Sequence, residues 1–336
     1  MSDKNGKEPP GERIAKVIAR AGLASRREAE AWIAAGRVCV NGKPITSPAL
    51  NVGPRDRIEV DGAPLPRRAR TRLFLHHKPR GLVTTHSDPE GRPTIFGALP
   101  KHFPRLISVG RLDMNTEGLL LLTNDGGLAR VLELPATGWL RSYRVRALGR
   151  VTQEALDKLR EGVTVEGVHY GPIEATLDRE QGANVWLTFS IREGKNREVR
   201  RVLESLGLKV NRLIRVSYGP FELGTLDDGE VKEVETAELR KLLGPELAKK
   251  AEADFEAPLE REQPRAPLIP ANAGLRKGKP TGHGRAGSPL ARGRTGEALH
   301  GQTEAREDER PRKPLHKRRR RPDRSGGPRP KYPRPK

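Results

Sequence analysis

The stretch of sequence that decides the fold is residues 110–126, GRLDMNTEGLLLLTNDG. Its centre, Leu119–Leu122, is a purely aliphatic run of the kind found in buried β-strands. Asp113 lies in the loop before this strand, next to Arg111 and Thr116. A carboxylate beside such apolar sequence loses solvation, so it needs hydrogen-bond donors or a cation in order to stay charged. These requirements fit a catalytic carboxylate, and they also fit a loop-capping or ion-paired Asp113.

Around this stretch, strands outnumber helices from residue 72 to residue 243. Apolar residues alternate with polar ones at several places, most clearly over residues 143–147, as in a half-buried strand. We expect further strands near residues 74–75, 82–85, 106–109, 163–165, 173–177, 185–190, 213–216 and 229–234, a turn at 124–126, and helices at 151–160 and 196–206. The irregular placement of the helices favours an α+β unit around a mainly antiparallel sheet.

The N-terminal part, residues 10–65, predicts a smaller α/β unit. Apolar spacing indicates helices from Ile14 to Ala21 and from Arg26 to Ala35. Ser25 and Glu28 form a capping-box pattern at the start of the second helix. A hairpin then follows at residues 38–45, with Asn-Gly as its turn, and another strand at residues 52–60.

The composition indicates which partners suit the chain. It has 336 residues, with 64 Lys plus Arg against 43 Asp plus Glu, and a formal net charge of +21. Such a charge favours polyanions, with nucleic acid first among them. A single Cys excludes a disulfide framework, and no apolar run is long enough to span a membrane. With no secretory signal in the sequence, we expect a cytoplasmic protein without membrane contact.

Two basic segments flank the larger unit. Residues 66–71, PRRART, predict a linker. Residues 251–336 combine many prolines and basic residues with few large apolar ones, so we expect a disordered Pro/Arg/Gly-rich tail. Its run Lys317–Arg321 fits a solubilising tail with weak attraction to phosphates, and it also fits a tether that raises the local RNA concentration.

The N-terminal unit resembles the S4 RNA-binding domain. The resemblance rests on residues 12–45, ERIAKVIARAGLASRREAEAWIAAGRVCVNGKPI. It implies that Arg26, Arg27, Arg37 and Lys43 face RNA phosphates. Arg26 and Arg27 also lie at a helix N-terminus, where the backbone amides and the helix dipole favour an anion. For each arginine taken singly, a solvated position on the helix surface remains an alternative.

The larger unit resembles the RsuA/RluB-type pseudouridine synthases. Every fixed position of their signature, Gly-Arg-Leu-Asp-x-x-Thr-x-Gly-Leu-Leu-Leu-Leu-Thr-Asn-Asp-Gly, is present at residues 110–126. Residues 77–81, 142–145 and 193–201 are similar to three further family segments. Arg141 stands where the family commonly has Lys, and Glu198 stands where it commonly has Gln. The resemblance extends from the N-terminal unit to about residue 235.

The resemblance implies an isomerase that detaches uracil from ribose C1′, rotates it and rejoins it through C5. Asp113 would be the catalytic carboxylate, attacking the sugar or the base or assisting formation of a glycal. Tyr143 would stack on the target uracil, and Arg200 would pair with Asp113 and keep it ionised. Tyr143 also fits an ordinary core position, and Arg200 also fits a phosphate-binding or helix-surface position.

A uridine in folded RNA must be flipped out of its helix before a pocket can receive it, and a basic surface must hold the RNA around it. The residues expected to bind substrate or RNA in the larger unit are Arg111, Thr116, Lys78, Arg80, Lys195 and Arg197. Arg111 alternatively forms a structural ion pair, and Thr116 alternatively organises the loop.

The resemblance further implies an rRNA substrate, with the large-subunit 23S rRNA favoured, and a monomer that takes part in rRNA processing and ribosome biogenesis. No cofactor or metal is expected: the reaction involves no redox step, and the eight His form no ligand pair at helical spacing.

Two other classes of protein remain as alternatives. The first is a non-catalytic S4-domain RNA-binding factor in ribosome assembly. The second is a basic ribosomal or nucleoid-associated protein, which would explain the charge but not the motif at residues 110–126.

Overall fold

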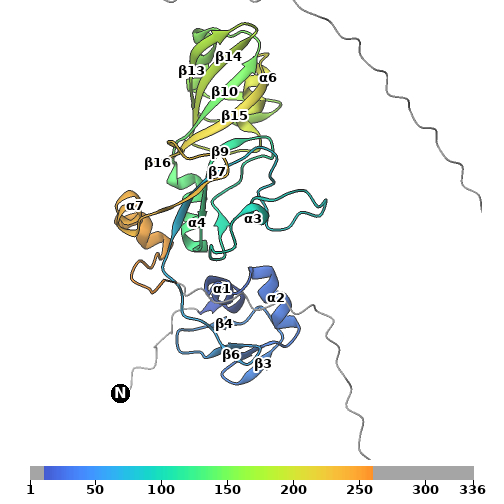
Figure 1. The fold of residues 1–336 in the computed structure, drawn as a ribbon, viewed down its shortest axis with the longest axis vertical. Coiled ribbons are helices and arrows are strands. Elements are labelled where there is room, and N and C mark those ends of the chain that lie inside the picture. The colour runs from blue at the N-terminus through green and yellow to red at the C-terminus, as the bar shows by residue number, and fades with distance from the viewer. Residues whose placement is uncertain (1–10, 260–336) are drawn as a thin grey trace, which may run out of the picture. The chain divides into compact units, whose positions relative to one another are not determined.

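The computed structural model describes residues 11–259 (Figure 1). The N-terminal unit contains two helices beside two small sheets, one of strands β3-β2-β5-β6 in that order and one of β1 and β4. Its elements are β1 (Glu12–Arg13), α1 (Ile14–Arg20), α2 (Arg26–Ala34), β2 (Val38–Val40), β3 (Lys43–Ile45), β4 (Asn51–Val52), β5 (Ile58–Val60) and β6 (Ala63–Pro64). The two helices pack on the four-stranded sheet through an aliphatic core that includes Ile14, Ile18 and Ile33.

Local sequence signals account for the ends of these elements. The Ser25 side chain accepts a hydrogen bond from the Glu28 amide at 3.1 Å, and the Glu28 carboxylate accepts one from the Ser25 amide at 2.6 Å. The predicted capping box is therefore confirmed. Asn41 and Gly42 have φ values of 53° and 77°, as a two-residue hairpin turn between β2 and β3 requires.

The larger unit is built on a nine-stranded sheet. Its main path runs β13-β14-β10-β15-β9-β7-β17, with β16 beside β15 and β8 beside β9. The pair β15–β9 is parallel and the other pairs are antiparallel, which confirms the predicted mainly antiparallel α+β architecture. The strands are β7 (Leu73–Lys78), β8 (Ile107–Ser108), β9 (Glu117–Thr123), β10 (Arg141–Leu148), β13 (Ile173–Gln181), β14 (Asn184–Ile191), β15 (Lys209–Tyr218), β16 (Phe221–Glu222) and β17 (Val231–Val234).

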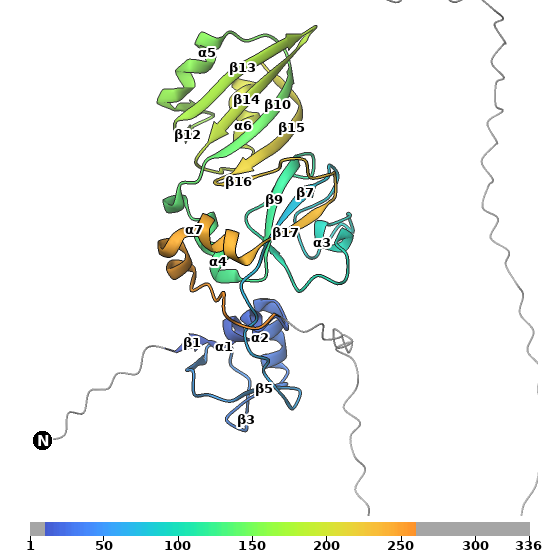
Figure 2. The ribbon, with the colours of Figure 1, turned by 60° about the vertical axis from the view of Figure 1, so that its left-hand side comes forward.

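Helices, turns of 3₁₀-helix and a small hairpin surround this sheet. They are α3 (Ile95–Ala98), α4 (Gly126–Glu133), η1 (Pro135–Thr137), α5 (Gln153–Asp157), η2 (Lys158–Glu161), the hairpin of β11 (Val163–Val165) and β12 (Val168–Tyr170), α6 (Glu198–Ser205) and α7 (Thr236–Ala251). Figure 2 shows β13, β14, β10 and β15 side by side. Apolar residues of α5, η2 and α6 join one face of these four strands in a single core.

Strand β9 is buried on both faces, which explains its unbroken run of leucines. Leu120 and Leu122 belong to the core that α6 helps to cover, whereas Leu119 and Leu121 belong to a second core with α4 and α7. A strand between two covered faces needs apolar residues at every position instead of every second one. The aliphatic run predicted as a buried strand is thus the centre of the sheet.

Some predicted elements differ in the structure. Residues 82–85 form no strand and make only an isolated bridge between Val83 and Thr94. The Thr84 hydroxyl donates instead to the Leu112 carbonyl, a local side-chain bond that replaces strand pairing. Residues 124–126 are the start of α4 as well as a turn, because the Asp125 side chain accepts hydrogen bonds from the amides of Gly127 and Leu128.

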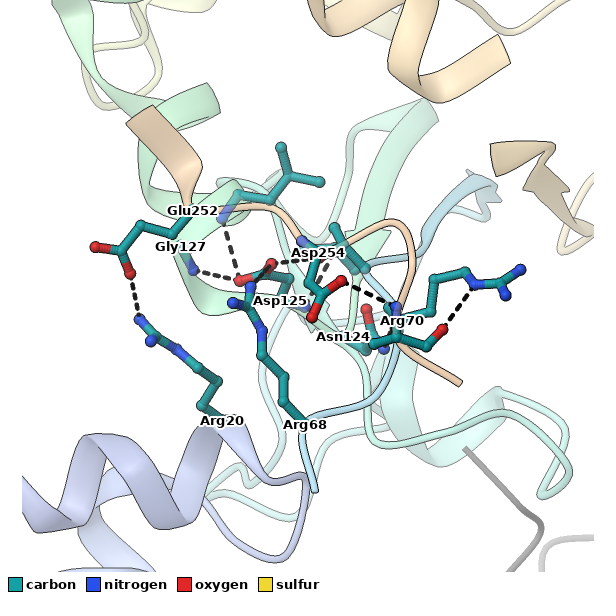
Figure 3. Close-up of polar contacts among 12 residues, drawn as sticks. Arg20, Arg68, Arg70, Asn124, Asp125, Gly127, Glu252 and Asp254 are labelled. Atoms are coloured by element: carbon teal, nitrogen blue, oxygen red, sulfur yellow. Dashed lines mark hydrogen bonds and ion pairs between the residues drawn. The ribbon is translucent and has the colours of Figure 1, made fainter. Parts of the chain in front are cut away.

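Asp125 also ties together segments that are distant in the sequence (Figure 3). Its carboxylate accepts a hydrogen bond from the Thr71 hydroxyl at 2.7 Å and lies 2.6 Å from the Arg68 guanidinium. Thr71 in turn donates its amide hydrogen to the Asp254 carbonyl at 2.7 Å. The predicted linker at residues 66–71 is therefore bound to the larger unit through Arg68 and Thr71.

The C-terminal boundary needs a correction. The prediction began a disordered tail at residue 251, but Ala251 and Phe255 are buried and the Pro258 carbonyl accepts a hydrogen bond from the Arg70 amide. Residues 251–259 thus pack on the unit, because two apolar side chains and the backbone bonds to residues 70–71 hold them. The rest of the predicted tail, residues 260–336 with its basic run, lies outside the described residues.

Gly118 offers a test of the parallel pair at the centre of the sheet. Its φ is 101°, and a Cβ there would lie 2.3 Å from the carbonyl oxygen and 2.7 Å from the amide nitrogen of Arg215. We expect Gly118→Ala to lower the free energy of unfolding by more than about 3 kcal/mol, because backbone atoms of β15 cannot move aside. Chemical denaturation measures this loss.

Gly182→Ala is the matched control for that variant. Gly182 also has a positive φ, 62°, but nothing lies within 4 Å of the added Cβ. Only backbone strain applies there, so the loss should be about 1 kcal/mol. If both variants lost the same free energy of unfolding, the need for glycine at position 118 would not come from the close approach of β9 and β15.

Candidate active site

The loop that carries Asp113 is anchored by a buried lysine. Lys78, at the end of β7, is fully buried, and its Nζ donates to the carbonyls of Pro79 at 2.9 Å, Thr116 at 3.0 Å and Met114 at 3.4 Å. These three acceptors use all three hydrogens of an ammonium group. Burial lowers the pKa of Lys78 to about 8, so the group still carries its charge at neutral pH.

Other donors engage the remaining carbonyls of the loop. The Leu112 carbonyl accepts from the Thr84 hydroxyl at 2.8 Å, and the Asn115 carbonyl accepts from the Arg200 guanidinium at 3.2 Å. The Asp113 carbonyl accepts from the Thr116 amide at 3.0 Å. Every carbonyl from residue 112 to residue 116 therefore has a donor, which leaves the loop backbone little freedom.

The Asp113 carboxylate itself is partly exposed on this fixed backbone. Its side chain is 36% exposed, and one oxygen lies 3.8 Å from the Arg197 guanidinium. Its negative charge also acts on Arg200 and on Lys78, since it raises the pKa of both groups against the effect of their burial. Three cations thus lie within electrostatic reach of a partly exposed carboxylate.

The predicted contact between Arg200 and Asp113 is replaced by another arrangement. The ion pair with Asp113 comes from Arg197, whereas Arg200 donates to the carbonyls of Asn115 and Val210. Burial and the neighbouring Arg197 lower the pKa of Arg200. Arg200 therefore supports the loop backbone directly and reaches Asp113 through its charge.

Arg197 owes its position to the start of α6. It is the N-cap residue and has φ 52° and ψ 28°, a left-handed conformation that a non-glycine residue rarely adopts. The helix therefore begins at Glu198 and not at the predicted Asn196. Backbone strain of this kind often occurs at functional sites, and here it accompanies the side chain that faces Asp113.

Tyr143 lies on the strand next to the anchored region. It is 7% exposed, belongs to the core covered by α6, and is the register partner of Arg215 on β15. Arg215 is in turn the partner of Gly118 at the start of β9. Tyr143 is thus close in the sheet to the end of the Asp113 loop, although within residues 11–259 it makes no hydrogen bond to Asp113.

Comparison with known proteins identifies both units. Residues 12–58 match the S4 domain family, and residues 72–205 match the RNA pseudouridylate synthase family. An RNA pseudouridine synthase of Rickettsia felis is 45% identical over 230 residues, which cover 68% of this chain and 100% of the relative. The chain belongs to the RNA pseudouridine synthase family. It is therefore an isomerase that acts on RNA, and not the non-catalytic factor or the basic structural protein considered as alternatives.

Two relatives in this family carry a more specific name, ribosomal large subunit pseudouridine synthase B. That of Pasteurella multocida is 40% identical over 261 residues, covering 75% of this chain and 76% of the relative. That of Pseudomonas aeruginosa is 44% identical over 246 residues, covering 70% of this chain and 63% of the relative.

Most of the predicted RNA-binding residues of this synthase are accessible. Exposed side chains are those of Arg26, Arg27, Lys43, Arg80, Arg111, Lys195 and Arg197. Arg37 is 34% exposed and forms a two-bond ion pair with Asp61 while stacking on Trp32. Lys195 donates to Glu193 and to the His169 carbonyl.

Lys78 and Thr116 are buried, so the structure corrects the prediction that they bind substrate or RNA. Lys78 points inward to three carbonyls, and no phosphate can reach an ammonium group whose donors are all used. Thr116 is 2% exposed, and its backbone groups bond to Asp113 and Lys78. Thr116 thus organises the loop, which was the alternative role expected for it.

Two contributors to the site escaped the sequence analysis. Thr84 binds the Leu112 carbonyl, and the Glu133 carboxylate accepts from the Gly110 amide at 2.6 Å. Thr84 lies in a segment whose β-branched residues resemble a strand, and Glu133 is an ordinary polar residue near the end of α4. No spacing rule could have linked either residue to the loop.

Glu198, where the family commonly has Gln, is buried beside a second carboxylate. One of its oxygens accepts from the Lys195 amide at 2.9 Å, and the other, Oε1, has no hydrogen-bond partner among the described residues. Burial raises the pKa of Glu198 to about 7, and the charge of Glu193 acts in the same direction. An uncharged, Gln-like form is therefore well populated near neutral pH.

The described residues contain neither a metal-binding cluster nor a membrane-spanning helix. Within residues 11–259, no group of three or more His, Cys, Asp or Glu side chains is placed to hold a metal ion. In that same range, no helix is both long and apolar enough to cross a membrane.

We expect Lys78→Met to lower kcat at least tenfold while the Kd for RNA changes less than about twofold. The variant leaves the carbonyls of Pro79 and Thr116 without their Lys78 donor, whereas the Met114 carbonyl keeps the Gly81 amide; this costs about 1–3 kcal/mol and frees the Asp113 loop. Single-turnover conversion, RNA binding and thermal unfolding measure these effects. Lys232→Met, at an exposed lysine of β17, is the control. A normal kcat in Lys78→Met would contradict the role of the lysine as an anchor.

Glu198→Gln tests the buried acid through the pH dependence of stability. The folded-state pKa of about 7 exceeds the ordinary value of 4.5, so the folded state binds more protons between these values. Glu198 therefore makes the wild type less stable as pH rises through this window. Between about pH 5 and about pH 8, we expect the free energy of unfolding of the variant to rise by about 1–2 kcal/mol relative to that of the wild type.

Urea unfolding at about pH 5 and at about pH 8 measures this change in the free energy of unfolding. Glu174→Gln, at an exposed position of β13, should show none. If Glu198→Gln and the wild type show parallel pH profiles, Glu198 is ionised throughout this range.

Proposed function

We propose that this synthase converts one uridine of the large-subunit 23S rRNA to pseudouridine, with Asp113 as its catalytic carboxylate. It acts in the cytoplasm as a monomer. Two relatives that cover most of this chain are named for the large ribosomal subunit, which supports this choice of substrate. The observation that carries the role of Asp113 is its position on a loop whose backbone is held by buried donors and whose carboxylate faces cations.

The carboxylate suits each chemical route that this isomerisation can take. An ionised Asp113 can attack ribose C1′ or the pyrimidine ring as a nucleophile, and as a base it can assist formation of a glycal. Arg197 lies 3.8 Å from the carboxylate, and the charge of Asp113 acts on Arg200. The fixed loop backbone means that little reorganisation is needed when substrate arrives.

Tyr143 receives the flipped uracil in this proposal. Its ring lies at the edge of the buried core, 7% exposed, on the strand that neighbours β15. An aromatic face can stack on a pyrimidine and offset part of the cost of removing it from the RNA helix, a few kcal/mol. Arg111, next but one to Asp113 and exposed, binds the phosphate of the flipped nucleotide.

Exposed cations on both units hold the surrounding RNA. Arg26 and Arg27 project at the N-terminus of α2, and Lys43 lies at the turn between β2 and β3. Arg80 and Lys195 add charge on the synthase unit near the loop and α6. These groups supply the sequence-independent part of the affinity, which falls as salt rises.

Asp113→Asn tests the catalytic assignment. The amide cannot act as an anionic nucleophile or base, so we expect conversion to fall by at least about 10³-fold while RNA binding stays within about twofold. Asp157→Asn on α5 is the control and should convert normally. Mapping pseudouridine in rRNA from cells with and without the protein identifies the site. A loss confined to small-subunit rRNA would contradict the proposed substrate, and normal conversion by Asp113→Asn would contradict the role of the carboxylate.

A further inference from the structure

The four strands β13, β14, β10 and β15 have a second face, which the helices of the unit do not cover. Along β10, Tyr143, Val145 and Ala147 are buried in the core with α5 and α6. Arg144 and Leu148, which alternate with them, are exposed. Because successive residues of a strand point to opposite sides, the exposed set defines an outer face that is turned away from the core side.

Basic residues cross this outer face in one row. The register pairs Arg179 with Trp186, Trp186 with Arg146, and Arg146 with Arg212. Residues opposite each other in paired strands lie on the same face, and neighbouring strands are about 4.8 Å apart. The row therefore places three arginines and one indole across four strands, over about 14 Å. Arg144 lies beside this row, two residues from Arg146 on the same strand.

Arg144 and Arg179 stack on the indole of Trp186, so their N–H groups remain available to another partner. The guanidinium carbons of Arg144 and Arg179 lie 5.4 Å and 5.6 Å from the centre of the Trp186 ring. Neither side chain has a hydrogen bond or ion pair with any residue between 11 and 259, and both are exposed. Stacking on an aromatic ring orients a guanidinium without using its N–H groups.

The acidic residues of the same face compensate only part of this charge. Glu117 is engaged with Arg212, at 2.8 Å, and the Asp178 carboxylate accepts from the Thr188 hydroxyl at 3.0 Å. Glu174 lies farther along β13, opposite Ser190, away from the row. In addition, Nε of Arg146 is buried without a hydrogen-bond partner among the described residues. Arg144 and Arg179 therefore offer unpaired guanidinium donors to a polyanion.

We propose that this outer face is a second RNA-binding surface, which holds the backbone of the substrate rRNA at a distance from the active site. Planar guanidinium groups match phosphate oxygens in geometry, and their spacing across the strands suits successive phosphates of one RNA segment. The inference rests on the proposed rRNA substrate, because only a long, folded RNA can reach both the Asp113 loop and the opposite face of the sheet. A short hairpin that fills the active site would leave the outer face empty.

The double variant Arg144→Gln/Arg179→Gln tests this surface in the full chain. With a full-length transcript of large-subunit rRNA, we expect Kd to rise about 5–20-fold and the slope of log K against log salt to fall by about 2. With a hairpin of about 20 nucleotides around the converted uridine, Kd and kcat should stay within about twofold of the wild type, since that RNA does not reach the outer face. Lys158→Gln/Arg160→Gln removes the same charge from η2 and is the control; it should leave both RNAs unaffected.

Ultraviolet crosslinking gives a second readout that does not depend on the variants. The full-length transcript should crosslink to the peptide that contains Trp186, and the hairpin should not. The proposal is overturned if the double variant binds the transcript like the wild type, or if the η2 control loses affinity to the same extent. A double variant that binds naked rRNA normally but no longer associates with ribosomal particles would indicate a protein partner instead, and would also overturn it.

These outcomes are separate from those of the proposed function. If the wild type converts no uridine of large-subunit rRNA, the proposed substrate fails, while loss of binding in the double variant still supports the outer surface. If the wild type converts its uridine and the double variant binds normally, the outer surface fails and the proposed function stands.

Discussion

The candidate active site depends on hydrogen bonds that satisfy the backbone carbonyls of residues 112–116 away from water. Each carbonyl in this loop has a donor, and the most important donor is the ammonium group of Lys78, which reaches two loop carbonyls and that of Pro79. Burying a cation is costly unless its hydrogen bonds are made. Because Lys78 ends β7 and the loop leads into β9, the pairing of these two strands brings the cation and its acceptors together.

This arrangement separates two tasks that cations perform at the site. Lys78 and Arg200 are buried and donate to backbone carbonyls, so they fix the loop, and their charges interact with that of Asp113. Arg197 and Arg111 are exposed, so their guanidinium groups are accessible from solvent. Basic side chains at this site therefore differ in role according to whether they are buried or exposed. The Asp113 carboxylate, 36% exposed, stays accessible from solvent on this fixed loop.

The sequence predicted the elements whose signals are local. The capping box at Ser25, the Asn41-Gly42 turn and the buried run Leu119–Leu122 were all recognisable, since each signal depends on neighbouring residues. The prediction failed where a residue distant in the sequence determines the local structure. Residues 82–85 have strand-forming side chains, but Thr84 binds the Asp113 loop instead. Lys78 looked like an RNA-binding cation because nothing local to it shows that three carbonyls surround it.

Strand β10 illustrates how one pattern can carry two functions. Its alternation places Tyr143 in the core on the side of α6, and it places Arg144 and Arg146 on the opposite side. A half-buried strand of an antiparallel sheet needs only polar residues on its outer positions, and serine or threonine would satisfy that requirement. Arginines stacked on Trp186 without carboxylate partners exceed it. Structural stability does not account for their charge, whereas contact with a long polyanion does.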